Sequence, residues 1–261
     1  MKVTIITVSY NSGNTIRKTL ESVKNQTYND IEFIVIDGHS TDNTVSVVEE
    51  FDNVDVFISE QDSGLYDAIN KGILLANGEL IGILNSDDVF FDNHVISNVV
   101  EYHKHCKVDI SLGDIVQYKE DIQNKKNKII RFYSSKKWTP KVLKYGYMPP
   151  HPSMFVKKYI YSEFGLYKLN YLIAADYEIM IRYFLKNNVS WGYSGVTTTK
   201  MLSGGVSNTG FKSYKIITKD IFQGFSENDI KFSRISVCLR FILKIFEFFI
   251  IPIKFKKNIE K

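Results

Sequence analysis

The first hundred residues alternate between short, mainly apolar runs and longer stretches in which apolar residues recur at helical spacing. The apolar runs have the length of strands and cover residues 3–8, 31–36, 54–58 and 80–84. Apolar residues at helical spacing follow at residues 16–23, 44–51 and 65–76. Strands that are apolar on both faces and joined by helices are typical of a parallel sheet with right-handed crossovers. The pattern therefore predicts an α/β fold for this half of the chain.

The pattern changes after residue 106. Short strands are predicted at residues 108–112, 115–118, 129–133, 189–193 and 196–201, and a helix at residues 174–188. Strands that follow one another so closely indicate a small antiparallel region beside the parallel sheet. No internal repeat and no long linker separates the two parts. We therefore expect one domain over residues 1–230.

The composition is that of a globular protein, with 44% hydrophobic and 24% charged residues among 261. The two cysteines, Cys106 and Cys238, lie far apart and match no zinc-binding spacing. This usage disfavours a disulfide-rich secreted fold and a thiolate metal site. The N-terminus has no signal-peptide layout, so we expect a cytoplasmic protein.

The positive charge is concentrated at the C-terminus. Residues 231–261 hold eight basic and two acidic residues, which leaves the first 230 residues with a net charge of −2. Nucleic-acid binding needs a broad cationic surface, so the body of the protein is a poor candidate for it. The tail is better suited to a membrane surface.

Residues 233–251 form a predicted helix with a narrow polar stripe and an otherwise apolar circumference. Arg240, Lys244 and Glu247 lie on the stripe, which argues against a helix that spans the bilayer. A helix that lies in the membrane interface, followed by the basic residues of 254–257, fits the pattern better. The alternative is a helix that docks on the protein's own core or on a second subunit.

Polar groups stand directly after each of the four N-terminal strands. They are Ser9, Tyr10 and Asn11 after the first strand, Asp37 to Asp42 after the second, Glu60 and Asp62 after the third, and Asn85 to Asp88 after the fourth. Parallel strands bring their carboxyl ends to one edge, where ligands of such sheets bind. Carboxylates beside a bound phosphate need a cation between them, and oxygen ligands suit Mg²⁺ or Mn²⁺.

Each of these segments also has a purely structural explanation. Asp37 and Gly38 could form an ordinary turn, and Asp87 with Asp88 could cap a helix. Asp67 and Lys71 are four residues apart on a predicted helix whose apolar stripe begins at Leu65. They could form a salt bridge on a solvated face, or line the cleft together with Asn70.

Seven short segments, taken in order, resemble the family 2 glycosyltransferases. These are inverting nucleotide-sugar enzymes of the GT-A fold, and the chain is especially similar to bacterial transferases of colanic-acid and exopolysaccharide type. The segments are Ile5 to Asn11, Asp37 to Thr44, Ser59 to Gly72, Asn85 to Asp88, Pro150 to Phe155, Ala175 to Glu178 and Gly204 to Ser207. Together they extend over roughly residues 3–207.

The resemblance implies a role for individual positions. Asp176 corresponds to the catalytic base, although an Asp at the start of a helix is often only a cap. Asp88 corresponds to the metal ligand and Asp87 to a carboxylate near the ribose. The remaining nucleotide-sugar positions implied are Val8, Tyr10, Asn11, Asp37, Asp62, Asp67 and Lys71. The positions implied on the acceptor or sugar side are His151, Glu178 and Gly205, although His151 could also be a loop histidine.

Gly38 departs from the family pattern, because many members carry a second Asp at this position. The resemblance also implies two halves within the predicted domain. Residues 1–106 would bind the nucleotide sugar, residues 107–230 would face the acceptor, and residues 231–261 would form the basic amphipathic helix.

The function expected is transfer of a sugar from a nucleotide-sugar donor to a saccharide or lipid-linked acceptor in bacterial surface polysaccharide synthesis. We expect the enzyme at the inner face of the cell membrane, with no nucleic acid as partner. A nucleotidyltransferase is a second possibility, but such an enzyme would require a basic, glycine-rich loop after the first strand. A non-catalytic sugar-binding or nucleotide-binding module is a third, and it would not need both the Asp87–Asp88 pair and Asp176.

Overall fold

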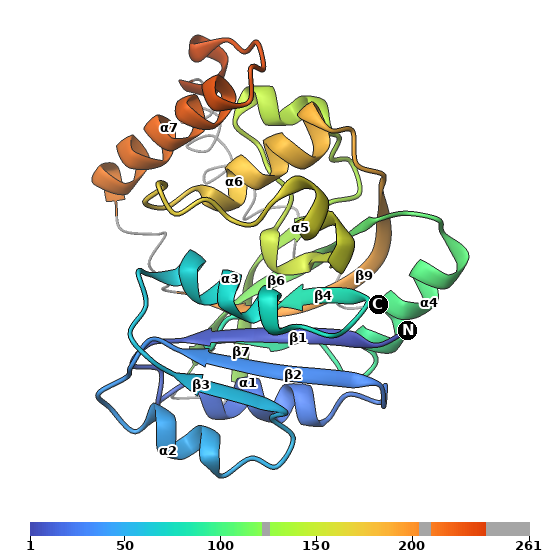
Figure 1. Cartoon of the computed structure of the whole chain (residues 1–261), viewed down its shortest axis with the longest axis vertical. Coiled ribbons are helices and arrows are strands. Elements are labelled where there is room, and N and C mark those ends of the chain that lie inside the picture. Colours follow the sequence, from blue (N-terminus) through green and yellow to red (C-terminus); the bar gives the residue numbers. More distant parts are fainter. Residues whose placement is uncertain (122–125, 204–209, 239–261) are drawn as a thin grey trace.

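The computed structural model describes residues 1–121, 126–203 and 210–238. These residues form one sheet between two layers of helices (Figure 1). Its strands are β1 (Val3–Ser9), β2 (Ile31–Asp37), β3 (Val56–Ser59), β4 (Leu80–Ile83), β5 (Asp88–Phe90), β6 (Ile110–Asp121), β7 (Lys126–Ser134), β8 (Met154–Lys157) and β9 (Trp191–Leu202). The order is β3-β2-β1-β4-β8-β6-β9-β5, with β7 paired to β6.

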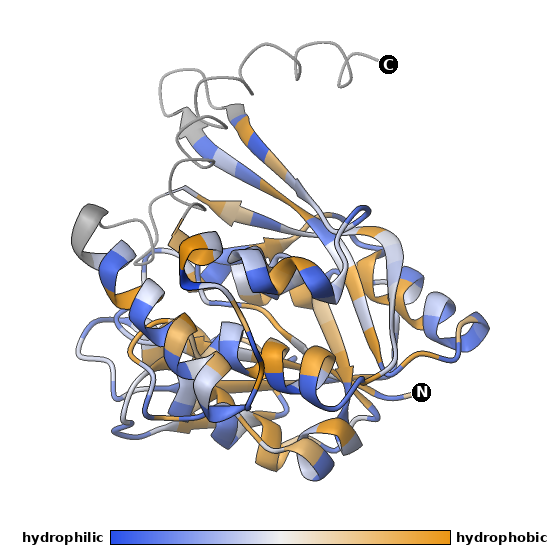
Figure 2. Cartoon of the chain, turned by 90° about the horizontal axis from the view of Figure 1, so that it is seen from above, coloured by the Kyte–Doolittle hydropathy of each residue, from blue (hydrophilic) through white to orange (hydrophobic). Residues whose placement is uncertain are grey.

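The first four strands are parallel, as their apolar sequences predicted. On one face of the sheet lie α1 (Ile16–Lys24), α2 (Thr44–Glu49) and α4 (Val95–His105). On the other face lie α3 (Leu65–Leu75), α5 (Lys158–Phe164), α6 (Ala175–Met180) and α7 (Gly210–Glu227). Figure 2 shows the helices with both hydrophobic and hydrophilic positions, as expected for helices with one face on the core.

Helix α3 approaches the sheet closely at Gly72. A Cβ atom there would lie 2.5 Å from Cγ2 of Ile6 on β1, so only glycine fits at this contact. This close packing sets the position of α3 on the face of the sheet, relative to the carboxyl ends of the strands. Its first turn therefore stands at the edge that the sequence marked as the candidate site.

The second half differs from the sequence prediction in its strands. The segments predicted as 108–112 and 115–118 are parts of one strand, β6, and those at 189–193 and 196–201 are parts of β9. β6 and β9 pair in parallel, with register shifts near Asp114, whereas β6 pairs antiparallel with β7 and β8, as the predicted antiparallel region requires. The predicted helix at 174–188 is present as α6, continued by a π-helical turn at Ile181–Lys186. Helix α7 was not predicted.

The segment after α7 packs back on the body of the protein. Phe232 stacks on Phe225 of α7 with ring centroids 4.5 Å apart, and Val237 is fully buried. Phe232 and Val237 thus contact the core, whereas Ile235 between them is 74% exposed. Residues 239–261, which hold most of the predicted amphipathic helix, lie outside the described residues. Among the residues that are described, no helix is long and apolar enough to cross a bilayer.

Candidate active site

Asp37 joins the carboxyl ends of three parallel strands. Ser9 of β1 is in register with Asp37, and Asp37 is in register with Ser59 of β3. The hydroxyl groups of Ser9 and Ser59 donate to the Asp37 carboxylate at 2.9 and 2.8 Å, and Ser40 donates from its backbone and its hydroxyl group. The side chain is fully buried. The Asp37 carboxylate thus holds the floor of the site together and is saturated with hydrogen bonds.

The loop after β1 is bound to the loop after β2. Asn11 has φ of +49°, a left-handed conformation that Asn tolerates well. Its side-chain oxygen accepts from the Thr41 backbone at 2.8 Å. Tyr10 beside it is 65% exposed, with its ring available to a ligand. The side chain of Val8, another of the predicted nucleotide-sugar positions, is buried in the core.

Asp62 fills the space that a side chain at position 38 would occupy. A Cβ atom on Gly38 would lie 2.6 Å from Oδ2 of Asp62. The other carboxylate oxygen of Asp62 accepts from the Gly64 backbone at 2.8 Å. A carboxylate therefore stands next to the end of β2 although position 38 itself is glycine.

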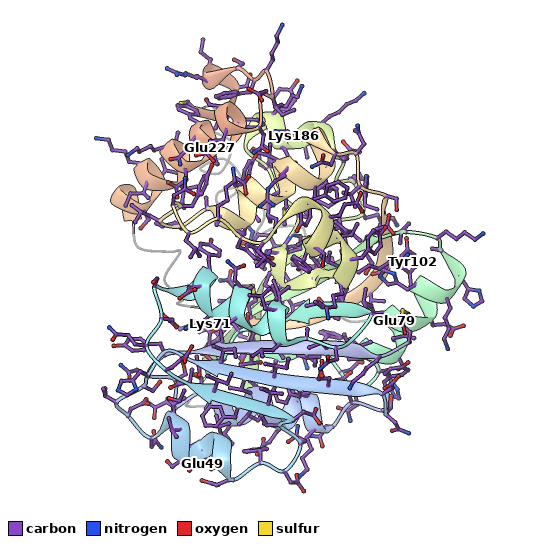
Figure 3. The ribbon with its side chains drawn as sticks, in the orientation of Figure 1. Glu49, Lys71, Glu79, Tyr102, Lys186 and Glu227 are labelled. Carbon is purple, nitrogen blue, oxygen red and sulfur yellow. The ribbon has the colours of Figure 1, made fainter. Side chains whose placement is uncertain are left out.

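Asp67 and Lys71 form the ion-pair arrangement that their spacing allowed. The Lys71 ammonium lies 2.8 Å from Glu60 and 3.8 Å from Asp67, and Figure 3 labels it on α3. The predicted apolar stripe of this helix is wrong at its first position, since Leu65 is 52% exposed. Asn70 is buried instead, and it exchanges two hydrogen bonds with the Tyr167 backbone at 2.7 and 3.0 Å. Asn70 thus does not line the cleft.

Asp87 and Asp88 bring two carboxyl groups to the end of β4. Asp88 begins β5, is 1% exposed, and accepts from the Asn85 side chain at 3.1 Å. Burial, and then the neighbouring Asp87, raises the pKa of Asp88 to about 8. Burial also raises the pKa of Asp87. Both carboxyl groups would be stabilised as anions by a cation beside them.

These residues fit a divalent ion that receives few of its ligands from the protein. Within the described residues, no group of three or more His, Cys, Asp or Glu side chains could hold a metal alone. Mg²⁺ commonly binds through one or two carboxylates and completes its shell with substrate phosphates and water. The Asp87–Asp88 pair meets that requirement.

Asp176 lies in the first turn of α6, whose N-cap residue is Ala174. Oδ2 of Asp220 on α7 accepts from the Ile173 and Ala174 backbones just before this helix, at 2.9 and 3.1 Å. Oδ1 of Asp176 lies 3.4 Å from the Tyr66 hydroxyl. Burial raises the pKa of Asp176 to about 6. A carboxyl group with this pKa is largely ionised at neutral pH and can accept a proton.

Glu178 has a structural role in the core. This differs from its predicted position on the acceptor or sugar side of the site. Its side chain is fully buried and pairs with Arg182 through both oxygens, at 3.1 and 2.8 Å. Lys168 and Asn228 contact the same carboxylate at 3.3 and 3.0 Å. Two positions along a helix correspond to a rotation of about 200°, so Glu178 and Asp176 point in different directions.

Arg182→Met should lower the free energy of unfolding by about 3 kcal/mol, because the buried Glu178 carboxylate loses its bidentate partner. Lys168→Met removes a more exposed partner and should cost about 1 kcal/mol. Urea unfolding of both variants measures the difference. If both variants lost the same free energy of unfolding, the buried pair of Arg182 with Glu178 would contribute no more than an exposed ion pair.

His151 stands between the sheet and α6, in a short 3-10 turn at His151–Ser153. Its Nε2 lies 2.7 Å from the Tyr167 hydroxyl. Burial lowers the pKa of His151 to about 4, so the ring is neutral at pH 7. Gly205, the other residue implied on this side, lies outside the described residues.

A hollow of about 600 Å³ lies away from these carboxylates, between α4 and β9. Phe91, Glu101, Tyr102 and Thr197 are among the residues that line it. It contains none of the strand-end groups. The carboxyl edge of β1 to β4 remains the better candidate, because parallel sheets bind their ligands there and the acidic groups converge on it.

The comparisons with known proteins settle the family. The model of the family "Glycosyl transferase family 2" matches residues 4–164. The chain belongs to this family. A "PGL/p-HBAD biosynthesis glycosyltransferase" of Mycobacterium tuberculosis is 26% identical to it over 211 residues, which is 78% of each chain.

Solved structures share the fold of this glycosyltransferase. S. aureus TarS 1–349 in complex with UDP-GlcNAc superposes with a TM-score of 0.67 at 16% identity, over 88% of this chain and 68% of TarS. A mannosyltransferase of Pyrobaculum calidifontis in complex with GDP-Man and Mn²⁺ gives 0.63 at 20% identity, over 87% and 63%. The predicted GT-A α/β fold is thereby confirmed.

Sequence reasoning missed Tyr66, Tyr167 and Asp220, the residues around Asp176. Tyr66 lies inside the segment Ser59 to Gly72 that resembled the family, so its position was available as a signal. Asp220 had no such signal, because it reaches Ala174 from 46 residues further along the chain.

Proposed function

We propose that this glycosyltransferase uses a nucleotide-sugar donor, a divalent metal and Asp176 as general base, and inverts the anomeric centre. The Asp176 carboxyl, which is half-buried and has a pKa raised to about 6, is the observation that carries the proposal. The complexes of the structural neighbours with UDP-GlcNAc, and with GDP-Man and Mn²⁺, support a donor of this class.

Inversion requires one direct displacement at the anomeric carbon. The acceptor hydroxyl attacks, its proton passes to the Asp176 carboxylate, and the bond to the nucleoside diphosphate breaks on the opposite side. Asp176 is ionised above its pKa, and its carboxylate is held by the Tyr177 backbone at 2.8 Å and the Tyr66 hydroxyl at 3.4 Å. Transfer should therefore fall as the pH drops below about 6.

Asp88 and Asp87 would hold the metal at the end of β4. When bound, the metal stabilises the charge that develops on the departing diphosphate. Tyr10 is exposed beside the same edge and can pack against the nucleobase. Asp62 beside Gly38 offers acceptor oxygens for the nucleoside.

Thermal shift measurements with UDP, GDP, UDP-GlcNAc and GDP-Man, each with and without Mn²⁺, test the proposal. A nucleotide that binds should raise Tm, and the increase should be larger with Mn²⁺. Isothermal titration that shows binding without any release of nucleoside diphosphate would favour a binding module. Formation of pyrophosphate from a nucleoside triphosphate and a sugar phosphate would favour a nucleotidyltransferase.

We also propose a saccharide or lipid-linked acceptor of a cell-surface glycan. The printed name of the mycobacterial relative, a PGL/p-HBAD biosynthesis glycosyltransferase, supports this class. Such an acceptor lies at the cytoplasmic face of the membrane, where the basic, apolar sequence of residues 239–261 would hold the enzyme. The protein would then be cytoplasmic and peripheral on the inner membrane face.

The full chain should sediment with anionic liposomes, and a chain ending at Cys238 should not. Each basic residue near the lipid contributes roughly 1 kcal/mol, and high salt should weaken binding only in part because apolar burial persists. The truncation keeps Phe232 and Val237, which pack on the body, so the shortened protein should stay folded. Undiminished sedimentation of the truncated chain would contradict the anchor.

A further inference from the structure

The N-terminus of α6 is held from two other elements. Asp220 of α7 accepts the backbone hydrogen bonds of Ile173 and Ala174. The single proton of the Tyr66 hydroxyl is shared between the Ile173 carbonyl and, at 3.4 Å, the Asp176 carboxylate. Tyr66 on α3 thus binds the backbone just before α6 and also contacts the Asp176 carboxylate.

The Tyr66 ring is itself fixed in place. It is 9% exposed and stacks on Tyr167, with centroids 5.8 Å apart and an angle of 14° between the planes. Tyr167 is held at its hydroxyl by His151 and at its backbone by Asn70. The Tyr66 hydroxyl therefore has little freedom to move away from the first turn of α6.

Tyr66 also links the two halves of the molecule. It lies in the first turn of α3, two residues after Gly64, which binds Asp62 on the donor side. Asp176 lies 110 residues further along the chain, on the acceptor side. A displacement of the donor loop would pass directly to the hydroxyl group that contacts Asp176.

We propose that Tyr66 is a positioning residue for Asp176, so that the donor side of the site holds the base in place through the first turn of α3. The proposal rests on the proposed function, in which Asp176 is the base. Tyr66 does not touch the reacting atoms. It acts on the reaction by fixing the backbone at Ile173, just before α6, and the carboxylate of Asp176.

The groups around Asp176 determine what loss of the Tyr66 hydroxyl would do. Tyr66 faces the carboxylate from α3, Tyr167 from the segment before α6, and Asp220 from α7. Burial raises the pKa of Asp176, hydrogen bonds from the Tyr177 backbone and the Tyr66 hydroxyl lower it, and the Asp220 charge raises it. Removal of the Tyr66 hydroxyl should therefore raise the pKa of Asp176, because burial and the Asp220 charge remain.

Tyr66→Phe removes one oxygen atom and keeps the stacked ring. The pKa of Asp176 can be followed in each protein by the ¹³C resonance of its carboxyl carbon, identified by its absence in Asp176→Asn. In Tyr66→Phe the titration midpoint should move above its value of about 6 in the unaltered protein. Nucleoside diphosphate release from UDP-GlcNAc with Mn²⁺ should show kcat reduced about tenfold and KM within about twofold.

Tyr183→Phe is the matched control. Its hydroxyl is also buried and donates to the Gly165 carbonyl at 2.7 Å, but it does not contact Asp176. This variant should lose stability without moving the Asp176 midpoint. If Tyr66→Phe does not fold, 3-fluorotyrosine at position 66, a stronger donor in the same place, should move the midpoint downward.

An unchanged Asp176 midpoint in Tyr66→Phe, or in the fluorinated protein, would overturn the positioning role. The result does not depend on the donor, because the titration needs no substrate. Full transfer activity in Asp176→Asn would instead refute the proposed base, while a moved midpoint would still establish the link between Tyr66 and Asp176. The two failures are thus distinguishable.

Discussion

Asp176→Asn should reduce sugar transfer by about 10²-fold or more, the range expected when a general base is lost. Nucleotide binding should persist, because Asp87, Asp88 and the strand-end loops are unaltered. Rates of nucleoside diphosphate release and Kd values from calorimetry measure the two effects separately. Glu163→Gln alters an exposed carboxylate on α5 and serves as the control. Near-normal transfer by Asp176→Asn would show that Asp176 has only a structural role.

The same substitution should stabilise the protein at alkaline pH. The pKa of Asp176 is raised to about 6 in the folded state, against 3.8 ordinarily, so folding favours its protonated form. That stability is fully present below a pH of about 4 and is lost as the pH rises through about 6. Asp176→Asn, which cannot ionise, should therefore raise Tm more at pH 8 than at pH 5. The gain in free energy at pH 8 should be roughly 2–3 kcal/mol.

Asp88→Asn should weaken nucleoside diphosphate binding by about 100-fold when Mn²⁺ is present and hardly at all when it is absent. The reason is that Asp88 is the deeply buried member of the only carboxylate pair proposed to meet the metal. Titrations with UDP and GDP, with Mn²⁺ and with a chelator, give the four affinities needed.

Asp87→Asn should also weaken binding, but part of its effect should remain without metal, because Asp87 is expected near the ribose. Glu49→Gln on α2, an exposed carboxylate labelled in Figure 3, is the control for a change in charge. A metal-dependent affinity that is unchanged in Asp88→Asn would refute the ligand assignment.

The location of the candidate site was available in the sequence because it depends on a general property of parallel sheets. Apolar runs place β1 to β4 side by side, and the residues that follow them, such as Asp37 and Asp88, must meet at one edge. The ordered motifs then pointed to the family, which the family match confirms. Neither inference required knowing which residues far apart in the chain contact one another.

The second half was less predictable, because its strands are long and change partners. β6 pairs with β7, β8 and β9 at different points, so its apolar pattern does not alternate regularly. Gly113 and the register shifts beside it interrupt the strand and gave it the appearance of two. Helix α7 has both polar and apolar residues without an obvious start, and the bonds from its Asp220 to the backbone before α6 depend on contacts across the fold.

The sequence by itself determined the α/β order, the acidic strand ends and the segment that contains Asp176, since each follows from local periodicity or a short motif. Only the tertiary structure decided which polar groups are already occupied. Asp37 is saturated by Ser9, Ser40 and Ser59, and Glu178 is bound by Arg182, whereas Asp176 meets Tyr66 and lies in a setting that raises its pKa. The reason is physical: burial and hydrogen-bond partners come from residues far apart in the chain, and these determine whether a carboxylate supports the fold or is free to accept a proton.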